Sequence, residues 1–297
     1  MIRVAAILPA AGRGQRFGGA GKASASKVEF ELAGKAVLLH ALDALMARPE
    51  VEQAVVAVDP SRFDEFADRW RDAVEARGGV LVRGGAKDRW ETVRLALGAV
   101  GDGCTHVAVH DAARPAASQA LLERVFAAAA LHDAVIPGLP VSDTLKRAEV
   151  DEDSSGVASG STSGGGRDLA DDILGLDPLA GLGGEGGGQA SPVEVQRVVE
   201  SVGRDGLFAV QTPQVFERGL LLRAYAALGD EPEGVTDDAS AVERLGEPVR
   251  IVPGDPTNLK LTRPEDAEVL EAILSARQTT DARDKVKELW ADEEDRW

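Results

Sequence analysis

A glycine-rich turn that carries two arginines follows the first apolar run of the chain. It reads Pro9-Ala10-Ala11-Gly12-Arg13-Gly14-Gln15-Arg16-Phe17-Gly18-Gly19, and Lys22 and Lys27 come after it. Small residues let backbone N–H groups approach a phosphate chain closely. A loop with several basic side chains and no acidic one is suited to binding a triphosphate, because negative charge builds up around the reacting phosphorus during displacement. The alternative interpretation is a tight surface turn with solvated basic side chains.

Two familiar nucleotide-binding motifs do not fit this turn. Phe17 stands where the dinucleotide pattern GxGxxG requires its third glycine. The Walker pattern GxxxxGK[ST] also fails, because no Lys-Ser or Lys-Thr pair follows at the required spacing. The turn therefore predicts phosphate binding of a different kind.

A carboxylate and a guanidinium follow a later apolar run. The run Thr105–His110 predicts a buried strand, and Asp111-Ala112-Ala113-Arg114-Pro115 comes directly after it. A carboxylate in that place can hold a magnesium ion that bridges phosphates. Alternatively, Asp111 caps the turn and pairs with Arg114. His106 and His110 lack metal-ligand spacing and read as strand histidines.

Short apolar runs alternate with helical patterns along the first 140 residues or so. Such alternation predicts βαβ units, a mostly parallel sheet, and ligands held outside the carboxyl ends of the strands. The predicted strands are Arg3–Leu8, Gln53–Val58, Val80–Arg83, His106–His110 and Ala134–Pro137, and the predicted helices are Ala36–Arg48, Ser61–Arg77, Asp88–Val100 and Ser118–His132.

The segment 151–192 interrupts this pattern, since it is rich in glycine, serine and acidic residues. Such a composition cannot bury enough apolar surface to offset chain entropy, so we expect a disordered insertion. After it, the sequence predicts strands at Val195–Val202, Leu207–Gln211, Val249–Val252 and Leu259–Thr262, helices at Phe216–Leu228, Asp238–Leu245 and Pro264–Arg277, and a charged tail at 276–297.

Composition narrows the class of protein. A formal net charge of −17 argues against general affinity for nucleic acid or anionic membranes, because the summed field repels polyanions. The single cysteine, Cys104, excludes an internal disulfide and a thiolate metal cage. No apolar run approaches the length of a membrane span. We therefore expect a cytoplasmic protein whose anionic ligands meet a local cluster of cations.

Six short motifs, in order, resemble those of the 2-C-methyl-D-erythritol 4-phosphate cytidylyltransferase family. The resemblance covers residues 1–275 apart from the insertion. It implies a Rossmann-like α/β three-layer sandwich, of the nucleotide-diphospho-sugar transferase type, with a mostly parallel central sheet and a projecting β arm for dimerisation. The six motifs are Pro9–Arg16, His110–Pro115, Asp143–Arg147, Gln211–Gln214, Thr236–Ser240 and Asn258–Asp266.

The resemblance also implies a reaction and its residues. A phosphate oxygen of methylerythritol phosphate would attack the α-phosphorus of CTP, with Mg²⁺ or another divalent cation as cofactor and pyrophosphate as leaving group. Arg16 and Lys27 would be catalytic. Nucleotide binding would fall to Pro9, Ala10, Ala11, Gly12, Arg13, Gly14, Gly84, Gly85, Thr92, Asp111 and Ala112; acceptor binding to Asp111, Arg114, Thr144, Arg204, Thr212, Thr236 and Lys260; metal binding to Asp111 and Asp255. A homodimer would form through the arm around residues 140–150 and 195–206.

Some residues depart from the family pattern. Ser26-Lys27-Val28 replaces Pro-Lys-Gln, so Lys22 stays an alternative to Lys27, although the spacing onward to Leu32-Ala33-Gly34-Lys35 favours Lys27. The Gly84-Gly85 loop is one residue longer than the corresponding loop of the family. Other functions left open are a cytidylyltransferase for another polyol phosphate such as ribitol 5-phosphate, a nucleotide-sugar glycosyltransferase, and a scaffold protein without catalytic activity.

Overall fold

The computed structural model describes residues 1–12, 26–150, 196–229 and 234–279. It divides into two compact units, one formed by Met1–Pro140 with the chain from Phe208 onward, the other by Val141–Leu207. The predicted insertion at 151–192 and most of the predicted tail lie outside the described residues. So do Arg13, Gly14, Arg16 and Lys22.

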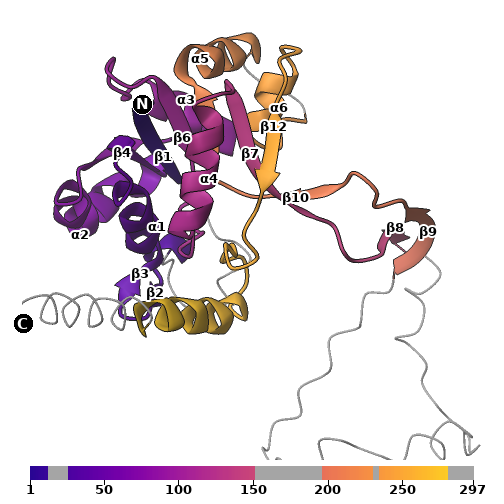
Figure 1. The fold of residues 1–297 in the computed structure, drawn as a ribbon. Helices are drawn as coiled ribbons and strands as arrows, with labels where there is room; N and C mark the ends of the chain where they lie inside the picture. The colour runs from indigo at the N-terminus through magenta and orange to yellow at the C-terminus, as the bar shows by residue number, and fades with distance from the viewer. Residues whose placement is uncertain (13–25, 151–195, 230–233, 280–297) are drawn as a thin grey trace, which may run out of the picture. The chain divides into compact units, whose positions relative to one another are not determined.

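The first unit is built on an eight-stranded sheet (Figure 1). Its strands run in the order β10-β7-β11-β6-β1-β4-β5, with β12 paired to β7. Parallel pairs join β1 to β4 and β6, β4 to β5, and β7 to β12, whereas β10 and β11 run antiparallel to their neighbours. The strands are β1 (Val4–Ala10), β4 (Val51–Val58), β5 (Gly79–Arg83), β6 (His106–Val109), β7 (Ala134–Pro140), β10 (Phe208–Val210), β11 (Gln214–Glu217) and β12 (Arg250–Pro253).

Helices cover both faces of this sheet, which gives the predicted three layers. Successive side chains of a strand point to opposite faces, so Val4, Ala6 and Leu8 enter one apolar core while Ala5 and Ile7 enter the other. The first core includes residues of α1 (Val37–Met46), α2 (Phe63–Glu75), α4 (Gln119–Ala129) and the helix 266–279. The second includes residues of α3 (Arg89–Leu97), α5 (Arg218–Ala227) and α6 (Asp238–Glu243).

Local sequence explains where several helices lie and begin. In α2 the buried residues Phe66, Ala67, Trp70 and Val74 recur at helical spacing, so one apolar stripe faces the core. The Ser118 hydroxyl accepts from the backbone N–H of Leu121, 3.2 Å away, and so caps the first turn of α4. Two short 3₁₀ helices, η1 (Lys27–Glu29) and η2 (Pro60–Arg62), connect larger elements, and β2 (Glu31–Leu32) pairs with β3 (Lys35–Ala36).

Most predicted elements are confirmed, but one helix begins later than expected and one predicted strand is absent from the described structure. The helix expected from Phe216 begins at Arg218, because Gln214–Glu217 forms β11 between β6 and β7. The strand expected at Leu259–Thr262 is a loop in the described structure. Leu261 is buried and its backbone N–H donates to the Ala113 carbonyl, 2.8 Å away, without extending a ladder.

Among its described residues, the second unit contains one antiparallel pair of strands. β8 (Leu145–Val150) pairs with β9 (Gln196–Val202), as the predicted β arm requires. Both strands are largely exposed in the single chain. Across both units, the described helices include none that combines the length and apolar character needed to cross a membrane.

Candidate active site

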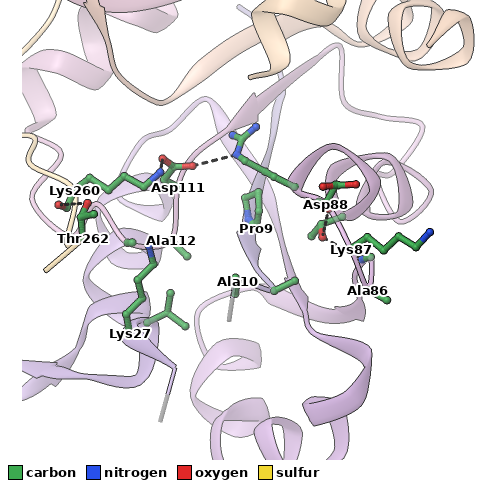
Figure 2. Close-up of a pocket in the computed structure, with 17 residues that line it drawn as sticks. Pro9, Ala10, Lys27, Ala86, Lys87, Asp88, Asp111, Ala112, Lys260 and Thr262 are labelled. Atoms are coloured by element: carbon green, nitrogen blue, oxygen red, sulfur yellow. Dashed lines mark hydrogen bonds and ion pairs between the residues drawn. The ribbon is translucent and has the colours of Figure 1, made fainter. Parts of the chain in front are cut away.

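A cavity of about 890 Å³ lies at the carboxyl ends of β1, β5 and β6 (Figure 2). Ligand sites in open α/β sheets occupy this position because the loops after parallel strands converge there. The wall comes from the end of β1 and the turn after it, η1, the loop from β5 together with the first turn of α3, the loop after β6, and the loop after β12. The lining residues are Pro9, Ala10, Ala11, Gly12, Lys27, Val28, Gly85, Ala86, Lys87, Asp88, Arg89, Thr92, Asp111, Ala112, Ala113, Lys260 and Thr262.

Asp111 holds three cations at the edge of this cavity. Its carboxylate lies 2.8 Å from Lys260 Nζ, 3.3 Å from Arg89 Nε and 3.7 Å from Arg114 Nε. Figure 2 shows the Lys260 and Asp111 side chains pointing toward each other. Burial would raise the pKa of Asp111, but attraction to Arg89 and then to Lys260 outweighs burial and holds that pKa well below its usual range. Asp111 is therefore an ionised carboxylate that fixes neighbouring cations.

Arg89 is a functional candidate that the sequence analysis missed. It occupies the first position of α3 and links Asp111 to the fully buried Asp238, whose carboxylate lies 2.7 Å from Arg89 Nη1. The Tyr225 hydroxyl donates to the other Asp238 oxygen, 2.5 Å away. Burial opposes the charge of Arg89, yet Asp238 and Asp111 raise its pKa above the ordinary arginine value. A cation directly after the Gly84-Gly85 loop was the available signal, whereas its partner Asp238 is distant in sequence.

A neutral histidine supports the turn that carries Asp111. His110 Nε2 lies 3.1 Å from the Arg114 carbonyl oxygen, and His110 Nδ1 lies 3.1 Å from Thr212 Oγ1. Burial lowers the pKa of His110 to about 4, so the ring is neutral at pH 7. Since a carbonyl only accepts, Nε2 carries the proton and Nδ1 accepts from the Thr212 hydroxyl. The Thr212 oxygen then accepts from the Asp111 backbone N–H, 3.0 Å away.

The loop between β5 and α3 is held close to its helix. The Thr92 hydroxyl accepts from the Gly85 N–H, 3.1 Å away, and donates to the Asp88 carbonyl, 3.2 Å away. A Cβ on Gly85 would lie 2.5 Å from the Glu91 carboxylate, and one on Gly84 would lie 2.8 Å from the Thr92 methyl group. Both positions therefore require glycine for close packing. The loop wall at Gly85–Asp88 faces the cavity, while Lys87 points away from Asp111 in Figure 2.

Residues after β12 place Lys260 beside Asp111. Arg114 Nη1 donates to the Asn258 carbonyl, 2.6 Å away, and the Asn258 side chain donates to the Thr212 carbonyl, 2.8 Å away. These bonds join the loops after β6, β10 and β12 into one unit. The loop therefore delivers the Lys260 ammonium to the cavity without being a strand.

Comparison with known proteins agrees with this arrangement. The model of the family 2-C-methyl-D-erythritol 4-phosphate cytidylyltransferase matches residues 4–159 and 191–276. The protein of that name from Frankia casuarinae is 39% identical over 275 residues, which are 92% of this chain and 82% of that protein. The chain belongs to this family.

A further relative and a solved structure are similar to this chain over most of its length. The bifunctional enzyme IspD/IspF of Anaeromyxobacter dehalogenans is 37% identical, and the aligned part is 94% of this chain but only 58% of that protein. A crystal structure of 4-diphosphocytidyl-2C-methyl-D-erythritol synthase aligns with a TM-score of 0.64 at 30% identity, covering 92% of this chain and 99% of that one. The family match leaves out residues 160–190, which lie within the predicted insertion.

Many site residues expected from the cytidylyltransferase family come together at the cavity. Those that line it are Pro9, Ala10, Ala11, Gly12, Lys27, Gly85, Thr92, Asp111, Ala112 and Lys260. Gly84, Arg114 and Thr212 do not line it but hold the loops that do. Thr236 directly precedes the N-cap residue of α6. Thr144 and Arg204 belong to the second unit.

The two expected metal ligands have different surroundings. Asp111 lines the cavity, whereas Asp255 does not. The Asp255 carboxylate accepts from the Ser118 hydroxyl at 2.5 Å and from the Thr257 hydroxyl at 2.6 Å, and lies 3.7 Å from Arg277 Nη2. Within the described ranges, no three His, Cys, Asp or Glu side chains gather as a metal site. Because magnesium often takes one or two carboxylates plus substrate phosphates, this sparse donor set fits an ion carried by a nucleotide.

Proposed function

We propose that this protein transfers CMP from CTP to 2-C-methyl-D-erythritol 4-phosphate in the non-mevalonate isoprenoid pathway. The products are 4-diphosphocytidyl-2-C-methyl-D-erythritol and pyrophosphate. The observation that carries the proposal is family membership over almost all of the described residues, including every loop that lines the cavity. Residues Pro9–Gly12 of the glycine turn, Lys27 and the Asp111–Lys260 pair converge there, and two phosphorylated reactants need that combination of close backbone approach and local positive charge.

The reaction is a displacement at phosphorus. An oxygen of the acceptor phosphate forms a bond to the α-phosphorus of CTP, and the bond from that phosphorus to the bridging oxygen of the β-phosphate breaks. The nucleophile is already ionised, so alignment and charge neutralisation matter more than a general base. His110 agrees with this view, because it is fully buried and its ring nitrogens already serve Arg114 and Thr212.

We assign roles to the chain's own residues as follows. Lys27, together with Arg16 outside the described residues, stabilises negative charge on the α-phosphate. Residues 9–14 hold the phosphates of CTP, and Gly84, Gly85 and Thr92 form the wall for cytosine. Lys260 binds the acceptor phosphate, and Asp111 keeps the Lys260 ammonium in place while facing ribose or acceptor hydroxyls.

Further acceptor contacts complete the proposal. Arg114 and Thr212 shape the acceptor side through the bonds that hold the Asp111 turn, while Thr144, Arg204 and Thr236 contact the acceptor itself. Bound magnesium would neutralise phosphate charge and ease departure of pyrophosphate, with Asp111 as its protein ligand and Asp255 as a second candidate. The enzyme acts in the cytoplasm as a homodimer joined through the arm at 140–150 and 195–206.

A pyrophosphate-release assay tests this function. Purified protein receives CTP, Mg²⁺ and one polyol phosphate from a panel that includes methylerythritol phosphate and ribitol 5-phosphate. We expect turnover with methylerythritol phosphate. Turnover with ribitol phosphate and none with methylerythritol phosphate would overturn the substrate assignment.

Charge-removing variants test the catalytic roles. Arg16→Ala and Lys27→Ala are each expected to lower kcat by roughly 10²-fold to 10³-fold, as loss of one oxyanion donor does in other enzymes. Lys35→Ala is the matched control, because Lys35 pairs with Asp43 at 2.7 Å and does not line the cavity. Full turnover in the Arg16 and Lys27 variants would remove both residues from the mechanism.

A further inference from the structure

Glu29 is a buried acidic residue two positions after Lys27, in the same 3₁₀ turn. Its side chain is only 3% exposed, and it does not line the cavity. A buried carboxylate is costly unless it is paired and hydrogen-bonded. Its partners must therefore account for its presence there.

Most partners of Glu29 come from η2 and α2. The Trp70 indole N–H donates to Glu29 Oε1 at 3.2 Å, and Arg62 Nη2 lies 3.0 Å from Oε2. Arg69 Nη1 is more distant, at 3.9 Å from Oε1. Trp70 itself packs in the first apolar core. Since η2 and α2 contribute no residue to the cavity, Glu29 fastens η1 to a part of the core remote from the reacting groups.

The remaining partner of Glu29 lies on the other side of Lys27. The Ser26 backbone N–H donates to Glu29 Oε2 at 2.9 Å, and the Glu29 backbone N–H donates to the Ser26 carbonyl at 2.8 Å. These two bonds join Ser26 to Glu29 and so hold the backbone on both sides of Lys27. Val28, between them, is buried in the core and also lines the cavity.

The backbone of Lys27 thus depends on tertiary anchors. A helix of three residues forms too few hydrogen bonds to be stable by itself. With Glu29 attached to α2 and Val28 in the core, the Lys27 side chain extends from η1 toward Ala112 in the cavity, as Figure 2 shows. Moving this turn would move the ammonium group relative to bound phosphate.

We propose that Glu29 is a positioning residue for Lys27, which acts by tying η1 to Trp70 and Arg62. The inference rests on the proposed function, because it concerns the alignment of a catalytic ammonium group. Glu29 contacts no substrate in this scheme. Its loss should weaken charge stabilisation in the transition state while leaving most of the CTP site intact.

Steady-state kinetics of the full chain test the proposal. Glu29→Gln keeps the shape of the side chain but removes the negative charge that faces Arg62. It also replaces one of the two acceptor oxygens with an amide nitrogen. We expect kcat to fall by roughly 10-fold to 10²-fold, the scale of a 1 Å misplacement, with a KM change for CTP below about 3-fold. Glu75→Gln is the matched control on α2, because Glu75 pairs with Arg71, 3.5 Å away, and both side chains are about half exposed.

A double-mutant cycle separates positioning from a general effect on the fold. In a Lys27→Ala background, Glu29→Gln should change kcat by less than about 2-fold, because the group it positions has been removed. A full 10-fold loss in both backgrounds would overturn the proposal, and so would an unchanged kcat in Glu29→Gln alone. An inactive wild-type protein would refute the proposed function as well. If instead the wild type is active, Lys27→Ala is impaired and Glu29→Gln is not, only the positioning role of Glu29 would be refuted.

A second variant covers the possibility that Glu29→Gln does not fold. Trp70→Phe keeps an aromatic ring in the core and removes the N–H donor to Glu29 together with part of the indole volume. We expect the same direction of change with a smaller loss of kcat, roughly 2-fold to 5-fold, and no further loss in the Lys27→Ala background. A Trp70→Phe protein with wild-type kcat would count against the role of this contact.

Discussion

Replacement of Arg89 by methionine is expected to destabilise the fold strongly, because it leaves Asp238 without its cation. Arg89 Nη1 lies 2.7 Å from a carboxylate that is fully buried, and the Tyr225 hydroxyl donates to the other oxygen of that carboxylate. Removing one member of a buried ion pair typically costs about 3–5 kcal/mol. Methionine keeps much of the packing volume of the arginine stem, so the loss reports mainly on the charge.

The assay is equilibrium unfolding in urea together with thermal unfolding. For a protein of 150–250 residues, each kcal/mol shifts Tm by about 2–4 °C, so Arg89→Met should lower Tm by roughly 6–20 °C. Arg83→Met is the matched control. Arg83 pairs with Asp64 at 2.8 Å, but both side chains are more than half exposed, and such surface pairs contribute about 0–1 kcal/mol.

Partial recovery in a double variant would identify the pair as the cause. Adding Asp238→Asn to Arg89→Met removes the unpaired charge, so the double variant should be less destabilised than the sum of the single variants, by about 0.5–3 kcal/mol. The reasoning would be refuted if Arg89→Met lost no more stability than Arg83→Met. Strict additivity in the double variant would refute the proposed link between Arg89 and Asp238.

Three further predictions concern other parts of the chain. Gly85→Ala should raise KM for CTP by roughly 10-fold or more, because its Cβ would lie 2.7 Å from the Glu91 Cβ, which cannot rotate away, and would displace the loop. Gly103→Ala, with open space around it, should not change initial rates. Burial lowers the pKa of His40 from its usual value near 6.5, so the unfolded state binds more protons below that pH. The free energy of unfolding should fall as pH drops from 7.5 to 5.5, and His40→Gln should reduce this dependence while the contribution of buried His110 remains. Deletion of residues 154–188 should leave turnover near the wild-type value, since the family match omits 160–190, and loss of the dimer by light scattering would contradict that expectation.

The later start of α5 and the missing strand at Leu259–Thr262 share a physical cause. The helix expected from Phe216 is preceded by β11, whose four residues become a strand because β6 and β7 flank them on both sides. Leu259–Thr262 has the apolar alternation of a strand but finds no ladder partner, so it forms the loop that presents Lys260. Short segments of this length carry little intrinsic preference, and tertiary contacts decide their conformation.

The sequence by itself determined the sheet, the turn and the cations. Continuous apolar runs such as Val4–Leu8 can only be buried on both faces, so they specify central parallel strands, and the glycine turn and Asp111 then lie at strand ends by chain order alone. The motifs in order specified the family.

Only the tertiary structure decided which charges meet. Arg89 reaches both Asp111 and Asp238, and Glu29 reaches Trp70 from 41 positions away. Neither pairing has a local pattern, because helix and strand periodicities report which face a residue occupies but not which distant side chain packs against it. Packing of the layers brings these groups within 4 Å of one another. Burial then requires each pairing, because an unpaired charge in the core would greatly destabilise the fold.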